Sequence, residues 1–252
     1  MPIKVIKNSV EYCTENKKFF IFILIVLFTC QFLINLVDSR FIGPLIMSLI
    51  MTGYGLQVTQ DIINGGIRLP KLQPGKIINF GIKGNIVLFF YVAIQGFFLA
   101  FVSKYLNFPP FVLENLFLNF NETINLIYSH NIGHCIIFLV SGFVIVYVTT
   151  FFMELALARL ADGGKLKNAF NFPRIKHAID IIGWRKYAWG YTKIILSIVI
   201  LTFIIHVNIP IHVVDSIFDA VLSFFVFIIE FIGIGNVYKV YVDSKSKVEN
   251  SD

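Results

Sequence analysis

Six stretches of this chain are long and apolar enough to cross a lipid bilayer, since about 20 mainly apolar residues span its hydrocarbon core as a helix. Only 14% of the 252 residues are charged and 57% are hydrophobic, whereas a soluble domain is about 25% charged. The sequence therefore predicts an all-α transmembrane fold, a six-span helical bundle. The predicted spans are residues 19–37, 41–62, 84–103, 135–158, 188–207 and 216–238.

Lys and Arg lie almost wholly on one side of the predicted bundle. With six spans of alternating direction, all of the 21 cationic residues except Arg40 and Lys104 fall on the same face. Cationic residues mark the cytoplasmic side of membrane proteins, so we expect both chain ends in the cytoplasm. The formal net charge of +6 then reflects topology and gives no reason to expect nucleic acid as a partner.

The spans divide the chain into three parts. Residues 1–18 form a cytoplasmic N-terminal tail, residues 19–242 the six-helix transmembrane domain, and residues 243–252 a cytoplasmic C-terminal tail. The longest outer loop is 104–133, in which apolar residues from Leu113 to Ile127 recur at helical spacing and predict a helix on or over the bundle. Basic cytoplasmic loops occupy 63–83 and 159–187.

A glycine pair ends the second and the fourth predicted span. The pairs are Gly65–Gly66 and Gly163–Gly164, and glycine readily adopts the positive φ that closes a helix. Basic residues, a proline and an apolar helical stretch follow each pair. This weak repeat suggests a bundle of three helical hairpins, linked by two basic helices at the membrane interface.

The second of these linking helices has the clearer pattern. Apolar residues share one helical face after Pro173, whereas Arg174, His177 and Arg185 lie elsewhere. Such a pattern is typical of an amphipathic helix that lies in the membrane interface. The apolar face consists of Ile175, Ala178, Ile179 and Ile182.

Two glutamates lie within predicted spans. Glu230 is near the middle of the sixth span and Glu154 is deep in the fourth. Because an ionisable group inside a membrane is costly, it is a functional candidate that could relay protons or bind a cation. The alternative is a protonated or hydrogen-bonded glutamate that joins two helices, with Glu154 meeting Arg159 near the interface.

The remaining candidates concern anions and metals. Basic residues of the two cytoplasmic loops could bind anionic lipid headgroups. His206, His212, Asp215 and Asp219 cluster between the fifth and sixth spans, but solvated helix ends explain them better than a metal site does. We find no catalytic constellation and predict no metal and no cofactor. The headgroup-binding candidates are Arg68, Lys71, Lys76, Lys165, Lys167, Arg174, Lys176, Arg185 and Lys186.

Residues 53–72 resemble one known family. They include Gly53-Tyr54-Gly55, the polar helix end Gln60-Asp61, the first glycine pair and Leu69-Pro70. In these features the chain resembles the archaeal and bacterial membrane proteins of domain of unknown function 4013, whose six-span layout agrees over about 19–242. The resemblance implies an integral membrane protein and carries over no activity and no catalytic residues.

These observations favour a prokaryotic multi-pass protein of the cell membrane. One reading is a transporter-like protein for a small solute or lipid, with Glu230 and Glu154 in its path. The other is a non-transporting scaffold or assembly factor that binds anionic lipid or a partner protein. A polar path from Glu230 to both faces would distinguish the first from the second; the oligomeric state is left open.

Overall fold

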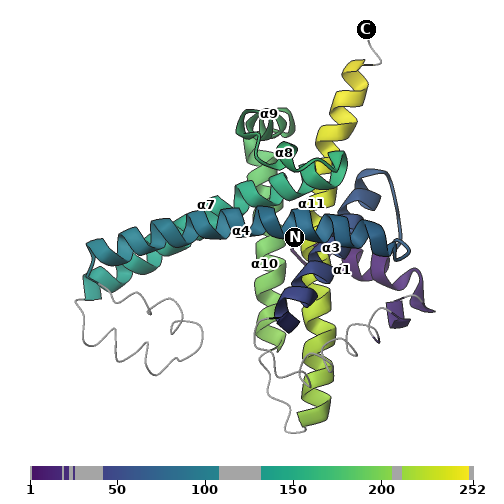
Figure 1. The fold of residues 1–252 in the computed structure, drawn as a ribbon, viewed down its shortest axis with the longest axis horizontal. Coiled ribbons are helices and arrows are strands. Elements are labelled where there is room, and N and C mark those ends of the chain that lie inside the picture. Colours follow the sequence, from purple (N-terminus) through teal and green to yellow (C-terminus); the bar gives the residue numbers. More distant parts are fainter. Residues whose placement is uncertain are drawn as a thin grey trace. The chain divides into compact units, whose positions relative to one another are not determined.

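The computed structural model describes residues 2–18, 20–22, 25, 42–107, 132–205 and 212–249, and every regular element in those ranges is an α-helix (Figure 1). The predicted all-α class is therefore confirmed. Most of the predicted first span, the outer loop after Asn107 and the side chains of the His206–Asp219 cluster lie outside the described part. The helices are α1 Pro2–Thr14, α3 Ile42–Ile63, α4 Pro74–Tyr105, α7 Ile132–Gly163, α8 Leu166–Ala169, α9 Phe172–Ile182, α10 Trp184–Ile205 and α11 His212–Glu249.

Three helical segments in the described residues are long and apolar enough to cross a membrane. They are Pro74–Tyr105, Gly133–Gly163 and Phe224–Lys245, with mean hydropathies of 2.3, 2.4 and 1.6. Helices α3 and α10 also form where the second and fifth spans were predicted. The membrane-protein class is thus supported, while six spans and the orientation of the ends stay predictions.

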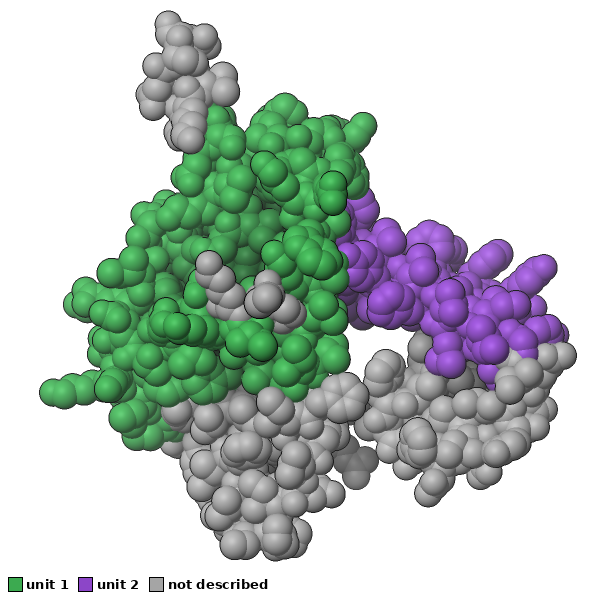
Figure 2. Space-filling model, turned by 180° about the vertical axis from the view of Figure 1, so that it is seen from behind, with its two compact units in different colours: residues 1–87, 154–252 green, residues 88–153 purple. Residues whose placement is uncertain are grey.

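The chain forms two compact units, coloured separately in Figure 2. Unit 2 is residues 88–153, which include the second half of α4 and the first part of α7. Large apolar side chains are exposed along both helices, among them Phe97 at 69% and Phe143 at 69%. Apolar exposure on this scale marks a surface that contacts lipid or protein rather than water.

Unit 1 comprises residues 1–87 and 154–252, and its central seam joins α3 to α11. A Cβ at Gly55 would lie only 2.5 Å from Cδ2 of Phe231, and one at Gly235 would lie 3.2 Å from Cβ of Ile62. Each helix thus presents a glycine to a large side chain of the other. Small residues allow such close packing of helices in a membrane.

The same helix α3 meets α4 even more closely. A Cβ at Gly53 would overlap the carbonyl oxygen of Ile77, and one at Gly81 would overlap that of Leu49. Gly53 and Gly55 therefore serve two different helices, α4 and α11. The two glycines therefore allow close helix packing on two sides of α3.

Both glycine pairs end helices, as predicted. Gly65 has φ +88°, and the amides of Gly65 and Gly66 donate to the carbonyls of Ile62 and Asp61, which closes α3 with a Schellman motif. Helix α7 closes with the simpler single bond, from the amide of Gly164 (φ +61°) to the carbonyl of Leu160.

The helices that follow the two pairs differ from each other. After the second pair, α9 buries Ile175, Ala178, Ile179 and Ile182, which confirms the predicted apolar face. Asn171 caps its start and Gly183, at φ +89°, ends it. After the first pair, the predicted separate linking helix is wrong, because α4 runs without a break from Pro74 to Tyr105.

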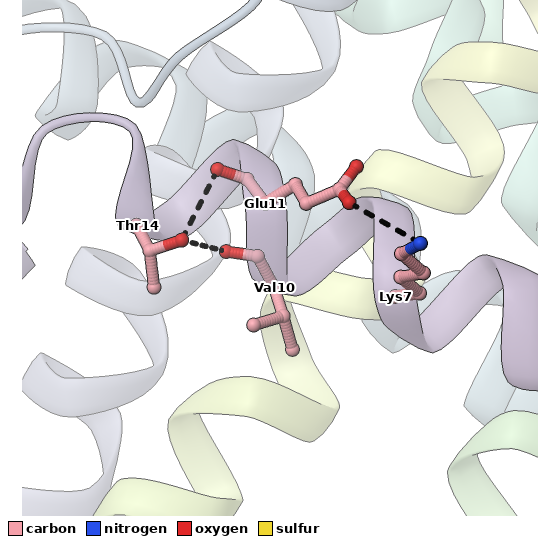
Figure 3. Close-up of polar contacts among 4 residues, drawn as sticks. All are labelled: Lys7, Val10, Glu11 and Thr14. Atoms are coloured by element: carbon pink, nitrogen blue, oxygen red, sulfur yellow. Dashed lines mark hydrogen bonds and ion pairs between the residues drawn. The ribbon is translucent and has the colours of Figure 1, made fainter.

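The N-terminal segment, expected to be a tail, is a helix that packs into unit 1. Tyr12 and Cys13 of α1 join a core cluster with Tyr54, Phe224 and Ile228. On the other side of α1, a Lys7–Glu11 ion pair of 3.8 Å and a bond of 2.8 Å from Thr14 Oγ1 to the Val10 carbonyl are contacts within the helix (Figure 3). One face of α1 is therefore packed into unit 1, whereas Lys7 and Glu11 are exposed.

We expect Gly53→Ala to destabilise the protein, because the added methyl overlaps a backbone carbonyl that cannot rotate away. Overpacking of this kind typically costs about 1–3 kcal/mol, more than the gain of up to about 1 kcal/mol from helix propensity. The measurement is the midpoint of thermal unfolding in detergent. Gly96→Ala is the matched control, since nothing lies within 4 Å of its added Cβ. Equal midpoints for both variants would contradict the close α3–α4 contact.

Candidate functional site

The two glutamates that the sequence singled out lie together in unit 1. Glu154 extends from α7 and Glu230 from α11, and a side-chain hydrogen bond joins their carboxyl groups. Glu154 is buried, at 4% exposure, and its Oε2 has no hydrogen-bond partner in the described part of the chain. Residues 76 positions apart therefore form one acidic pair.

Arg159 does not neutralise this pair, contrary to the suggested contact with Glu154. Its guanidinium donates from Nη1 to the carbonyl of Arg174 at 2.9 Å and from Nε to that of Asn168 at 3.3 Å. The arginine thus fastens the α8–α9 region to the end of α7. The two carboxyls are left to satisfy each other.

Several polar contacts lie close to the C-terminal ends of α3 and α7, the first turns of α4 and residue 238 of α11. We call this region the basic end of unit 1. Gln60 Nε2 donates to the carbonyl of Ala161 at 2.9 Å, and Lys83 Nζ donates to that of Gly164 at 2.8 Å. The hydroxyl of Tyr238 donates to Asp162 at 3.2 Å. These bonds connect α3, α4 and α11 to the C-terminal end of α7.

A cavity of about 610 Å³ opens at the basic end. Arg159 and Asp162 contribute from α7, Arg174 and His177 from α9, and Tyr238 and Lys245 from α11. A second, more open hollow of about 500 Å³ is lined by residues of α10 that include Arg185 and Trp189. The first cavity has the greater concentration of ionisable groups.

A comparison with models of known protein families identifies the family of this chain. The family model described as "Protein of unknown function (DUF4013)" matches residues 39–211. The chain belongs to the DUF4013 family. No curated protein and no solved structure matches it.

In this DUF4013 protein the nine predicted headgroup-binding residues do not form one site. Arg174 lines the 610 Å³ cavity, and Arg185 and Lys186 line the hollow on α10. Lys76 stacks on the ring of Phe80, 5.8 Å from its centroid. The others are exposed on the surface of unit 1: Arg68, Lys71, Lys165, Lys167 and Lys176.

No group of three or more His, Cys, Asp and Glu side chains that could hold a metal ion occurs among the residues whose side chains are described. That range leaves out the cluster from His206 to Asp219, whose predicted lack of a metal site stays a prediction. Cys13 and Cys135 are both free and buried. Burial raises the pKa of the Cys13 thiol to about 12, so it is a packing residue at neutral pH.

One polar contact in this DUF4013 protein was not predicted from the sequence. The hydroxyl of Tyr12 donates to Oδ2 of Asp61 at 2.9 Å and so ties α1 to the end of α3. Asp61 was noted only as part of a polar helix end, and Tyr12 only as part of a tail. Burial, followed by the neighbouring Asp61, raises the pKa of Tyr12 above its ordinary value.

We expect Tyr12→Phe to lower the free energy of unfolding by about 1 kcal/mol at neutral pH, because a partly buried hydrogen bond is lost. The raised pKa of Tyr12 keeps its proton in the folded state, whereas the unfolded chain releases it above its ordinary pKa of 10.0. The stabilising effect of Tyr12 is therefore complete below about pH 10 and declines at higher pH.

The measurement is thermal or denaturant unfolding of wild type and Tyr12→Phe between about pH 7 and 11. The difference between them should stay constant at first and shrink above pH 10. Tyr105→Phe, at a side chain that is 82% exposed, is the control and should match wild type. A difference that does not change with pH would contradict the raised pKa.

Proposed function

We propose that this chain is a multi-pass protein of the prokaryotic cell membrane, with six spans and both ends in the cytoplasm. The contacts at the basic end support this topology, because they place the end of α3, the start of α4, the end of α7 and the later part of α11 at one level. An alternation of directions between successive spans produces this arrangement. The 21 Lys and Arg residues, nearly all on that side, make it the cytoplasmic one.

Cysteine labelling tests this topology. In a variant with Cys13, Cys30 and Cys135 replaced by serine, we expect Ile67→Cys and Lys167→Cys to resist a membrane-impermeant maleimide in intact cells and to react in inverted vesicles. Ile67 and Tyr105 are 75% and 82% exposed, so access is limited by the membrane alone. Tyr105→Cys should behave in the opposite way. Labelling of Tyr105→Cys and Ile67→Cys from the same side would overturn the topology.

We also propose that the protein moves a small solute or a lipid and that the Glu154–Glu230 pair is its proton site. The contact between the two carboxyls is the observation that carries this proposal. Two ionised carboxyl groups in contact repel each other, so a shared proton would stabilise the pair. Such a pair can take up and release a proton when the access of water changes.

The basic end supplies the ionisable side chains that are nearest to the pair along α7. Glu154 is five residues from Arg159 and eight from Asp162 along α7, which is about 12 Å at most at 1.5 Å per residue. In the other direction along α11, residues 224–229 are all apolar. The four residues between Glu154 and Arg159 on α7 are apolar and buried as well, so we expect water to reach the pair only when the helices move.

The alternative is a scaffold that binds anionic lipid or a partner protein and transports nothing. The exposed cations of both cytoplasmic loops favour it, and topology alone accounts for the same charges. In that case the carboxyl pair is a packing contact between α7 and α11. The two candidates therefore differ in whether the pair exchanges its proton.

The test is pH-difference infrared spectroscopy on the purified protein in lipid. If the pair is a proton site, wild type should show a carboxyl signal that changes between about pH 5 and 8, and both Glu154→Gln and Glu230→Gln should remove it. Glu11→Gln is the control, because Glu11 is a surface carboxyl with 64% side-chain exposure. A carboxyl signal that stays constant over this range would reject the proton site.

Proton flux gives a second readout. In vesicles with a trapped pH indicator and an imposed membrane potential, we expect the rate of wild type to exceed that of Glu154→Gln and Glu230→Gln by about tenfold or more, since a positioned acid–base group typically contributes at least that much. Glu11→Gln should match wild type. Equal rates for all variants would favour the scaffold.

A further inference from the structure

The cavity at the basic end has the properties of an anion site. Its lining includes three cationic side chains, Arg159, Arg174 and Lys245, against one carboxyl group, Asp162. Its volume of about 610 Å³ is within the range of about 300–1,000 Å³ typical of small-molecule sites. Charge and size together fit a compact ligand that carries negative charge.

Arg159 is the centre of this site because it is buried and has no carboxylate partner in the described residues. It is 8% exposed, and both of its hydrogen bonds go to neutral backbone carbonyls. Asp162, the nearest carboxyl in the lining, accepts instead from Tyr238. A buried charge without a counter-charge is costly, so an anion that meets Arg159 relieves a cost already present in the fold.

The geometry of Arg159 also leaves donors for a ligand. Guanidinium has five N–H groups in a fixed plane, and the two bonds to Asn168 and Arg174 use two of them. These bonds fix the orientation of the side chain before any ligand arrives. Arg174, whose own backbone amide is capped by Asn171, adds a second guanidinium at the same cavity. Paired guanidinium groups suit phosphate oxygens, which accept two parallel hydrogen bonds.

Aromatic residues near this cavity fit a position at the headgroup level of a membrane. The cavity lies beside α9, whose apolar face is buried in unit 1. Trp184, which begins α10 directly after α9, is 46% exposed, and tryptophan and tyrosine are enriched at the headgroup level of membranes. Tyr238 and Tyr241, with ring centroids 5.2 Å apart, form part of the wall on α11.

We infer that this cavity binds a phosphate-bearing anion, held by Arg159 and Arg174. The shared chemistry is a phosphate group, supplied either by the headgroup of an anionic phospholipid or by a soluble organic phosphate. The site is separate from the carboxyl pair and does not require that the protein transports anything. Binding here can therefore fail or succeed independently of the proton-site proposal.

The first test measures lipid binding by native mass spectrometry, with phosphatidylglycerol compared against phosphatidylcholine. We expect wild type to retain phosphatidylglycerol preferentially and Arg174→Gln to weaken this binding about tenfold, as charge-assisted hydrogen bonds are lost. Lys176→Gln is the matched control, because it removes the same charge from the same exposed helix outside the cavity. A surface cation contributes only about fivefold through the general field.

Arg159→Gln should have an effect at least as large, but it also removes the bonds to Asn168 and Arg174. If Arg159→Gln unfolds, the test rests on Arg174→Gln, because Arg174 is exposed and its replacement should not unfold the protein. Each variant is used only if its melting midpoint without ligand equals that of wild type, so that a loss of binding is not caused by unfolding. Equal losses for Arg174→Gln and Lys176→Gln would overturn the proposal, since the general charge of the surface would then explain all binding.

A second arm identifies the source of the phosphate. Glycerol 3-phosphate is titrated into detergent-solubilised protein, and the shift in melting midpoint is recorded for wild type and Arg174→Gln. A saturable shift that Arg174→Gln reduces supports a soluble phosphate ligand. No shift, together with selective phosphatidylglycerol binding, supports the lipid headgroup. The absence of selectivity in both arms rejects the site.

Discussion

The closeness of α3 to its two neighbours is the constraint on which unit 1 depends. Gly53 faces the backbone of α4, whereas Gly55 faces Phe231 of α11. The hydroxyl of Thr59, one turn further along, donates to the carbonyl of Phe231 at 3.0 Å. A side chain at either glycine would separate the helices, and this buried hydrogen bond would lengthen. In an apolar environment, van der Waals contact and such bonds replace the hydrophobic effect as the source of helix association.

The basic end follows from the same physics, because helix ends have carbonyls without partners. Side chains from other helices supply donors to several of them. Gln60 and Lys83 bond the carbonyls of Ala161 and Gly164 near the end of α7, and Arg159 bonds that of Asn168 in the short helix α8. The second bond of Arg159, to the carbonyl of Arg174, joins it to the first turn of α9. Each donor thus satisfies a backbone group and also fixes one element against another. The cavity lies among these fixed elements, so its cationic lining is held in place by the fold.

The sequence predicted features that depend on local pattern. The apolar face of α9 follows from a periodicity after Pro173, and the helix ends at the glycine pairs follow from backbone conformation. The end of α9 at Gly183 was not predicted, since Arg185 was expected on the same helix and lies in α10. The continuity of α4 was missed because Lys83 and Gly84 suggested a boundary. Gly84 instead lies against Thr52 and Leu56 of α3, a tertiary contact that no local pattern reveals.

At the candidate site, too, local sequence patterns identified single residues but not the contacts between helices. A glutamate within an apolar helix is visible in the sequence, and both Glu154 and Glu230 were found in this way. Their contact depends on how α7 and α11 are rotated about their axes, which the 75 residues between them do not encode locally. The docking of α1 was missed for a related reason, since a single tyrosine bond to Asp61 and a buried Cys13 determine it.

The carboxyl pair and the cationic cavity lie on the same two helices, and this links them mechanically. Glu154 and Asp162 are on α7, whereas Glu230 and Tyr238 are on α11, and the two members on each helix are eight positions apart. Two cross-helix contacts, Glu154–Glu230 and Asp162–Tyr238, therefore lie in the same register. An α-helix is stiff over two turns, so a rotation or shift of α11 against α7 that breaks one contact also strains the other.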